Sequence, residues 1–232
     1  MHLTKSNAHK AGLLYLSIAV FGIFAHFFVR TPLLEAPDAA TAATMIADNP
    51  TLFRLGFVAD VLSQLSHFFL VLLLYRMFKE VNSTAARLML ACVLVSVSIS
   101  FLNLLNMYAA LQLALPGITL TDFAPAQQQA LSAFFLQLHD HGYNIAGIFF
   151  GLWLYPLGLM AKQSGRIPKI IGYLLMLGCF GYMLEFLVEF LFPQYPGVAI
   201  PGLILASAGE FSFLFYILIK GLKQEPKALA TA

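Results

Sequence analysis

Nine ionisable side chains lie within long apolar stretches of the chain, where a charge is costly. They are His26, Asp60, His67, His139, Asp140, His141, Glu185, Glu189 and Glu210. In membrane proteins, ionisable residues at such positions face a bundle interior or a wet cavity and mark functional sites. Carboxylates and imidazoles can bind a metal ion, carry a proton, or hydrogen-bond to the polar group of a ligand.

Metal chemistry is one alternative for these residues. Nitrogen and oxygen ligands for Zn²⁺ or non-haem iron are offered by His26, Asp60, His141 and Glu185. Two histidines on facing helices could also ligate a haem, and His26 with His141 is such a pair. No HExxH motif and no paired ExxH motif occurs, so no spacing requires a metal. Metal and haem stay open as cofactors of a metal-dependent intramembrane enzyme.

Two further alternatives need no metal. An apolar cavity with a few converging polar groups binds small or lipid-like molecules, and the chain has 22 Phe and 9 Tyr that could line one. Ligand binding of this kind is our leading hypothesis. In the other alternative, Glu210 and His67 form part of a proton or ion pathway across the membrane. Motifs of soluble enzymes, such as the P-loop, the dinucleotide fingerprint and the nucleophile elbow, do not occur.

The composition places most of the chain in lipid. Of 232 residues, 60% are hydrophobic and 10% charged, and the mean hydropathy is +0.82. Soluble domains have roughly 45–50% apolar and about 25% charged residues. The net charge of +2 and the 2 cysteines also exclude a nucleic-acid-binding module and a disulfide-stapled secreted fold.

Six apolar stretches are long enough to span a bilayer, which takes about 20 residues of helix. We predict an all-α, six-helix membrane bundle that forms a single integral domain over residues 1–232. The predicted spans are 12–29, 52–75, 85–113, 131–160, 167–192 and 201–219. Between the first two spans, Asp38 is suited to cap a short helix at the outer surface, near residues 38–48.

Basic residues predict the orientation of the chain. Positive charges in short loops are retained on the cytoplasmic side, and only Arg30 and Arg54 among the 13 basic residues fall at the opposite ends of the spans. The other side collects Lys5, Lys10, Arg76, Lys79, Arg87, Lys162, Arg166, Lys169, Lys220, Lys223 and Lys227. We therefore expect both termini in the cytoplasm and the protein in the cytoplasmic (inner) membrane of a bacterium.

The depth of several polar groups predicts one shared site in the outer third of the bilayer. Depth is counted along each helix at about 1.5 Å per residue from its cytoplasmic basic end. Four pairs are each 16 residues, or about 24 Å, apart, namely Lys10 and His26, Arg76 and Asp60, Arg87 and Asn103, and Lys169 and Glu185. The ligand-binding or proton-handling candidates are Arg54, Asp60, Asn103, His139, Asp140, His141, Tyr143, Asn144, Glu185 and Glu210.

Helical periodicity predicts which side of the fourth span faces this site. At about 100° per residue, Asp140, His141 and Asn144 fall on one polar stripe. His139 lies to the side of that stripe, with Tyr143 on its flank. Periodicity therefore favours His141 as the inward histidine.

Some candidates also have simpler structural explanations. Amide side chains hold transmembrane helices together through hydrogen bonds of about 0.6 kcal/mol each, so we favour a packing role for Asn103. Arg54 fits an anchor at the membrane interface, with pairing to Asp60 as the alternative. Asp60, Asp140 and Glu185 are harder to explain as packing groups, because carboxylates at one depth repel one another unless a proton or a cation balances them.

Several motifs resemble one family over nearly the whole chain. They are FRLGFVAD (residues 53–60), NLLN (103–106), QLHDHGY (137–143) and SGRIPKIIGYLL (164–175). Together they resemble the bacterial and archaeal integral membrane family called domain of unknown function 4386. The residues that match its pattern are Arg54, Asp60, His139, Asp140, Gly142, Tyr143 and Glu210, whereas the family more usually has an aromatic residue in place of His141. The resemblance implies a polytopic membrane protein, assigns no activity, and favours His139 over His141 as the site histidine.

Overall fold

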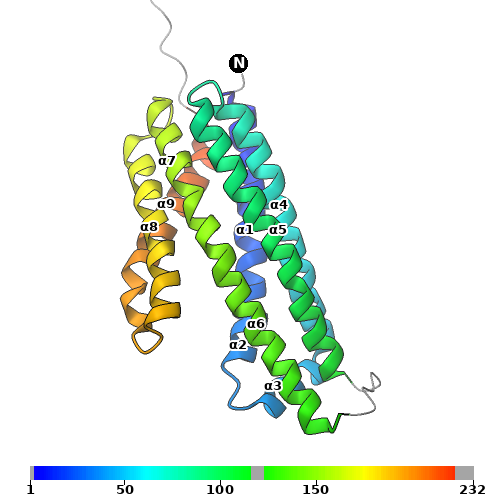
Figure 1. Cartoon of the computed structure of the whole chain (residues 1–232). Helices are drawn as coiled ribbons and strands as arrows, with labels where there is room; N and C mark the ends of the chain where they lie inside the picture. The colour runs from blue at the N-terminus through cyan, green and yellow to red at the C-terminus, as the bar shows by residue number, and fades with distance from the viewer. Residues whose placement is uncertain (1–2, 116–122, 223–232) are drawn as a thin grey trace, which may run out of the picture. The chain divides into compact units, whose positions relative to one another are not determined.

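A computed structural model describes residues 3–115 and 123–222, and all of its elements are helices. In chain order they are α1 (Lys5–Ile23), the π-helix η1 (Phe24–Arg30), α2 (Thr31–Leu34), α3 (Ala39–Asp48), α4 (Pro50–Phe78), α5 (Ser83–Ala114), α6 (Pro125–Leu152), α7 (Leu154–Gln163), α8 (Lys169–Leu191), the 3-10 helix η2 (Pro196–Val198), α9 (Ile200–Phe215) and the π-helix η3 (Tyr216–Lys220). Figure 1 labels the α-helices along the chain. The predicted all-α class is confirmed.

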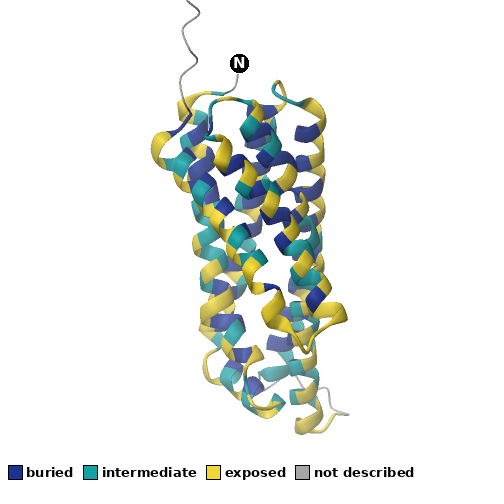
Figure 2. Cartoon of the chain, turned by 90° about the vertical axis from the view of Figure 1, so that its left-hand side faces the viewer, coloured by how far each residue is buried: buried dark blue, intermediate teal, exposed yellow. Residues whose placement is uncertain are grey.

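Six of the described helices are long and apolar enough to cross a membrane, as predicted. They run over Lys5–Leu34, Pro50–Phe78, Ser83–Ala114, Pro125–Gln163, Lys169–Leu191 and Pro196–Lys220. Exposed positions are spread along these helices (Figure 2), and many carry large apolar side chains, such as Phe28, Leu102 and Phe190. Such a surface fits a lipid environment. The chain is therefore a multi-pass membrane protein.

The orientation of the spans and the choice of the inner membrane remain predictions. Two of the basic residues counted for the orientation, Lys223 and Lys227, lie outside the described residues, as does the loop over 116–122.

The chain is organised as two compact units. Unit 1 comprises Met1–Tyr15, Phe69–Leu94 and Gly147–Ala232, as far as these segments are described, and unit 2 comprises Leu16–Phe68 and Val95–Ala146. A single integral domain stays a prediction.

Unit 2 has an apolar core between η1, α2, α3, α4, α5 and α6. Val29, Ile46, Phe53, Met107 and Leu136 are buried in it, each from a different segment. The short helix α3 contributes through one face, because Ala42, Ala43 and Ile46 are its buried residues.

Asp38 caps α3 as predicted. Its side chain accepts a hydrogen bond from the backbone N–H of Thr41, at 2.7 Å. This bond satisfies one of the backbone donors left free in the first turn of a helix. It also lowers the pKa of the Asp38 carboxyl from its usual value of 3.8, because the hydrogen bond favours the ionised form.

Unit 1 is held by close helix contacts at small residues. A Cβ atom placed on Gly158 of α7 would lie 2.4 Å from the carbonyl oxygen of Gly172 on α8. Likewise, a Cβ on Gly181 of α8 would lie 2.2 Å from the carbonyl oxygen of Gly202 on α9. Small residues let helix backbones approach this closely. In lipid, the hydrophobic effect does not drive helices together, so helix association depends on such close packing.

Candidate functional site

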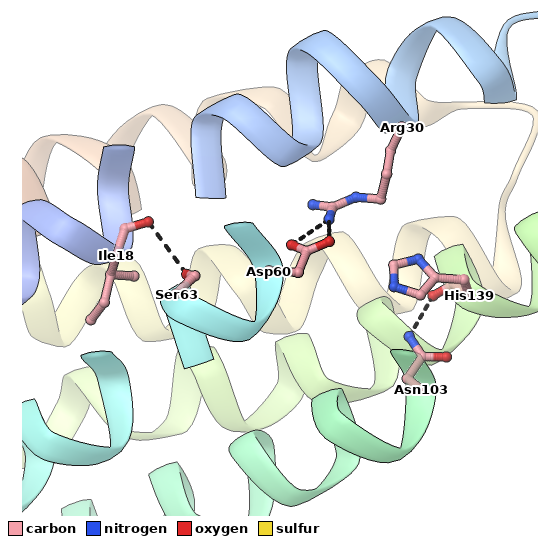
Figure 3. A network of polar contacts seen from close by, with 6 residues as sticks. All are labelled: Ile18, Arg30, Asp60, Ser63, Asn103 and His139. Carbon is pink, nitrogen blue, oxygen red and sulfur yellow. Dashed lines mark hydrogen bonds and ion pairs between the residues drawn. The ribbon is translucent and has the colours of Figure 1, made fainter. Parts of the chain in front are cut away.

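A buried ion pair joins η1 to α4 in unit 2 (Figure 3). Arg30 Nη1 donates to both carboxylate oxygens of Asp60, at 2.6 Å and 2.5 Å. The two side chains are 5% and 7% exposed. Gly56, one turn before Asp60 on α4, allows the helices to meet, since a Cβ there would lie 2.7 Å from Val29 on η1.

Two further features of the Arg30 guanidinium are a nearby aromatic ring and a nitrogen that has no hydrogen-bond partner among the described residues. Its Cζ atom lies 4.9 Å from the ring centroid of Tyr143 on α6, a distance at which a cation is attracted to the ring. Among the described residues, no hydrogen-bond partner reaches its buried Nη2 atom. Buried polar atoms in native proteins nearly always have a partner, and one without calls for a water, an ion or a ligand. Arg30 therefore has donor capacity left inside the membrane-spanning region.

His139 lies in the same part of unit 2, where α5 meets α6. Asn103 Nδ2 donates to the backbone oxygen of His139 at 2.7 Å (Figure 3), and Asn103 Oδ1 accepts from Asn106 at 2.9 Å. The His139 ring is buried and lies 6.4 Å, centroid to centroid, from Tyr143. A Cβ on Gly142 would lie within 3 Å of three atoms of the Asn103 amide, which explains the glycine at this position. The Asn103 amide thus links α5 to α6 through a hydrogen bond.

The predicted facing of α6 is wrong. His141 is exposed, Asn144 is only half-buried, and the buried histidine is His139. The close approach of Gly142 to Asn103 turns the His139 side of α6 inward. A polar stripe could point outward because the span over Pro125–Gln163 has 39 residues. At about 1.5 Å per residue it is longer than a hydrocarbon core of about 30 Å, so part of it can face water.

Arg54 does not pair with Asp60. It is exposed on α4, and Arg30 is the partner instead. Arg30 was missed because the first span was expected to end at Val29, which would leave Arg30 in a loop. In the structure the helix continues through Arg30 to Leu34, with Pro32 in its first α-helical turn, a position that tolerates proline. The sequence did contain a signal that the helix continues through Arg30, because no proline or glycine separates Arg30 from the mostly apolar residues 24–29.

Two other candidates lie within electrostatic range of the ion pair. The charge of Asp140 acts on Arg30, and His26 interacts with Arg30, Asp60 and Asp140. The His26 side chain is itself exposed and contacts Phe27, with 4.7 Å between ring centroids. The centre of the site in unit 2 is therefore Arg30, Asp60 and Tyr143, with His26 and Asp140 at its margin.

Glu185 and Glu210 belong to unit 1, and Glu210 has a polar site of its own there. Its carboxyl oxygens accept hydrogen bonds from Tyr15 of α1 at 2.9 Å and from Tyr182 of α8 at 3.0 Å. Trp153 and Phe213 flank the ring of Tyr15, with centroids 5.8 Å and 6.2 Å away. No basic side chain within the described residues pairs with Glu210. The sequence did not point to the tyrosines as partners of Glu210, because Tyr15 lies 195 residues away along the chain.

The metal candidates do not form a ligand cluster. Within residues 3–115 and 123–222, no three His, Cys, Asp or Glu side chains are placed so that they could hold a metal ion. His26 and His141, considered as haem ligands, are both exposed. The geometry of the donors thus gives no support to the metal or haem hypotheses.

Comparisons with known proteins match the chain to one family of unknown function. The model described as Domain of unknown function (DUF4386) matches residues 10–221, which confirms the resemblance seen in the motifs. An uncharacterized protein of Archaeoglobus fulgidus is 37% identical to this chain over 93 residues. That match covers 40% of the chain and 51% of the relative, so the chain spans about half the length of the relative. No solved structure matches the chain.

Proposed function

This chain belongs to the family described as Domain of unknown function (DUF4386), and we propose that it is an integral membrane protein that binds a small, lipid-like ligand at Arg30. The proposal rests on the Nη2 atom of this buried arginine, which has no hydrogen-bond partner among the described residues. A ligand oxygen would accept the hydrogen bond that no described residue accepts. Lipid-like molecules reach such a site through the bilayer, in which the spans lie.

The charge balance of the site favours a neutral acceptor on the ligand. Asp60 already neutralises Arg30 through Nη1, and the charge of Asp140 also acts on Arg30. A further anion would leave an excess of negative charge in a medium of low dielectric constant, where unpaired charge is costly. A carbonyl or hydroxyl oxygen on an apolar body avoids that cost.

Entry of the ligand requires movement, because Arg30 is only 5% exposed. The segment that carries Arg30 is a π-helix over Phe24–Arg30. Short π-helical segments recur at functional sites of proteins. We therefore assign the movement to η1, which would open the Nη2 side of Arg30 and leave the ion pair to Asp60 in place.

The structural alternative is an ion pair that only joins helices, with a water on Nη2. To separate the two, the full chain is purified in a mild detergent and its bound small molecules are extracted and measured by mass spectrometry. Arg30→Lys keeps the charge and loses the second donor group of the guanidinium. Arg54→Lys makes the same change at an exposed arginine of α4.

We expect one stoichiometric lipid-like molecule with a carbonyl or hydroxyl group in the wild type and in Arg54→Lys, and its loss in folded Arg30→Lys. The same extract from all three proteins would contradict the proposal. Should Arg30→Lys not fold, Tyr143→Leu removes the ring beneath the guanidinium and should lower the retained amount. Unchanged retention in that variant counts against ligand binding at Arg30.

Proton or ion transport is a second candidate function, and Glu210 is the observation that favours it. Its carboxyl group lies in a span, accepts from two tyrosine hydroxyls and has no basic partner among the described residues. Ionisable residues of this kind form proton relays in transporters. Vesicles containing the purified chain and a pH-sensitive dye test it. Proton flux that is lost in Glu210→Gln and kept in Glu189→Gln, a matched change at an exposed glutamate of α8, supports transport, and absence of flux in the wild type argues against it.

A further inference from the structure

Within the described part of the chain, the buried polar and charged side chains all belong to unit 2. They are Arg30, Asp60, Ser63, Gln64, His67, Ser96, Ser100, Asn103, Ser132 and His139. Two stripes at helical spacing stand out among them, with Asp60, Gln64 and His67 on α4, and Ser96, Ser100 and Asn103 on α5. Figure 3 shows one end of these stripes, at Asp60 and Asn103. Because lipid offers no hydrogen bonds, polar groups inside a span need partners from the protein or from bound water.

The side chains in the middle of the two stripes lack such partners. Gln64 and Ser100 are each 5% exposed. Neither Gln64 Oε1 nor Ser100 Oγ has a hydrogen-bond partner among the described residues. An unpaired polar atom in an apolar interior costs free energy, and native proteins nearly always supply a partner for it. Each of the two oxygens therefore calls for a bound partner.

Both side chains point into the interior of unit 2. Phe53 of α4 and Met107 of α5 are buried in the same core. At about 100° per residue, Gln64 lies about 20° from Phe53 around α4, and Ser100 lies about 20° from Met107 around α5. The two oxygens are thus on the faces that these helices turn toward their common core.

Gln64 and Ser100 also lie at nearly the same height. The two helices are antiparallel, because only residues 79–82 separate the end of α4 from the start of α5. Counted along each helix from that turn, Ser100 is about three positions, or about 5 Å, further away than Gln64. Side chains lean toward the N-terminus of their own helix. Gln64 therefore leans toward the level of Ser100, and Ser100 leans toward the level of Gln64.

We propose that a water molecule is bound between α4 and α5 in unit 2 and bridges Gln64 to Ser100. It donates a hydrogen bond to Gln64 Oε1 and accepts one from the Ser100 hydroxyl, so both oxygens gain a partner. A sodium ion fits this place less well, because its two ligands would be neutral oxygens. Asp60, the acid one turn away, is already paired with Arg30, so the charge of the ion would stay unbalanced in an apolar interior.

The bound water extends the polar interior of unit 2. It lies between the level of the ion pair at Asp60 and that of His67, about two turns further along α4. Ionisable side chains beside water inside a membrane protein mark routes for protons and polar groups. The inference stands apart from ligand binding at Arg30, because it rests on different atoms and involves no lipid.

The first test is a crystal structure of the full chain, grown in lipid, at a resolution that shows ordered water. We expect one spherical density within about 3 Å of both Gln64 Oε1 and Ser100 Oγ. A direct hydrogen bond between the two side chains, or no density beside them, overturns the inference. This test uses the wild type, so it does not depend on the folding of any variant.

The second test measures the midpoint of thermal unfolding in detergent. Ser100→Ala and Gln64→Leu should each lower the midpoint by about 2–4 °C, the shift that corresponds to one hydrogen bond in a chain of this size. The double variant should lose less than the sum of the two shifts, because either change alone breaks the bridge. Ser132→Ala is the matched control, since this buried hydroxyl donates to the backbone oxygen of Ala110 at 2.8 Å. Its shift should add fully to that of Gln64→Leu.

Two outcomes of the thermal test overturn the inference. One is a fully additive loss in the double variant, which would show that Gln64 and Ser100 share no bridge. The other is a midpoint that rises when sodium replaces choline in the buffer, in the wild type but not in Gln64→Leu, which would assign the site to a cation. We expect equal midpoints in the two buffers. Failure to find a ligand at Arg30 would change none of these results.

Discussion

Arg30 Nη1 lies 2.6 Å from Oδ1 and 2.5 Å from Oδ2 of Asp60, so that one nitrogen serves both carboxylate oxygens. This arrangement leaves Nη2 without a partner among the described residues, and Tyr143 lies under the guanidinium. A buried pair that served stability alone would gain from using both nitrogens of the guanidinium fork. The proposed ligand binding therefore rests on this nitrogen, which has no partner among the described residues.

The first prediction concerns the stability of this pair. Arg30→Gln or Asp60→Asn should lower the free energy of unfolding by about 3–5 kcal/mol, because each leaves a buried charge without its partner. The double change Arg30→Met with Asp60→Leu should cost much less, since it removes both charges. Unfolding of the purified chain in detergent, followed by circular dichroism, measures these differences. Arg54→Gln, at an exposed position, should stay within about 0.5 kcal/mol of the wild type, and an equal loss in that control would point to a general effect of removing arginine.

Local features of the fold could be predicted from the sequence. The spans follow from apolar length, and α3 follows from a capping residue, so Asp38 and the helix over Ala39–Asp48 were both expected. Each depends only on residues that are close in the chain. The same reasoning failed at Arg30, because Pro32 sits in a turn that tolerates proline and the helix continues past it.

The partners within the sites could not be predicted. Periodicity gives the relative facing of residues on one helix, but the rotation of α6 depends on its contact with α5 at Gly142 and Asn103. That contact makes His139, and not His141, the buried histidine. The tyrosine partner of Glu210 on α1 is 195 residues away, and nothing in the local sequence marks it.

The second prediction tests the contact that sets the rotation of α6. Gly142→Ala should destabilise the chain by about 1–3 kcal/mol, the usual cost of overpacking. The new Cβ would lie 2.3 Å from Asn103 Oδ1, and that amide is held by His139 and Asn106, so it cannot move aside freely. The unfolding free energy in detergent is the quantity to measure.

Gly147→Ala is the control for that change, because no atom lies within 4 Å of a Cβ at Gly147 of the same helix. It should be neutral or slightly stabilising, since alanine favours helix over glycine. Adding Asn103→Ala to Gly142→Ala should recover part of the loss. A cost for Gly147→Ala equal to that for Gly142→Ala would contradict the role given to the contact.

The third prediction concerns the hydrogen bonds to Glu210. Tyr15→Phe and Tyr182→Phe should each cost about 1 kcal/mol in the free energy of unfolding, the typical net contribution of one hydrogen bond. In a Glu210→Ala background, Tyr15→Phe should cost close to nothing, because its acceptor is already gone. Tyr173→Phe, at an exposed tyrosine of α8, serves as the control. Equal effects of Tyr15→Phe with and without Glu210 would argue against this hydrogen bond.

The fourth prediction is a pH dependence of α3. The hydrogen bond from Thr41 lowers the pKa of Asp38 below its usual 3.8, so folding favours the ionised carboxylate. The stabilisation by this cap is therefore fully present above pH 3.8 and is lost as the pH falls through the lower pKa of the folded state. Amide hydrogen exchange in α3, corrected for the intrinsic effect of pH, should accelerate in that range. Asp38→Asn keeps a capping side chain that does not titrate, so its exchange in α3 should show no such step, and an identical step in both proteins would assign the pH dependence to another group.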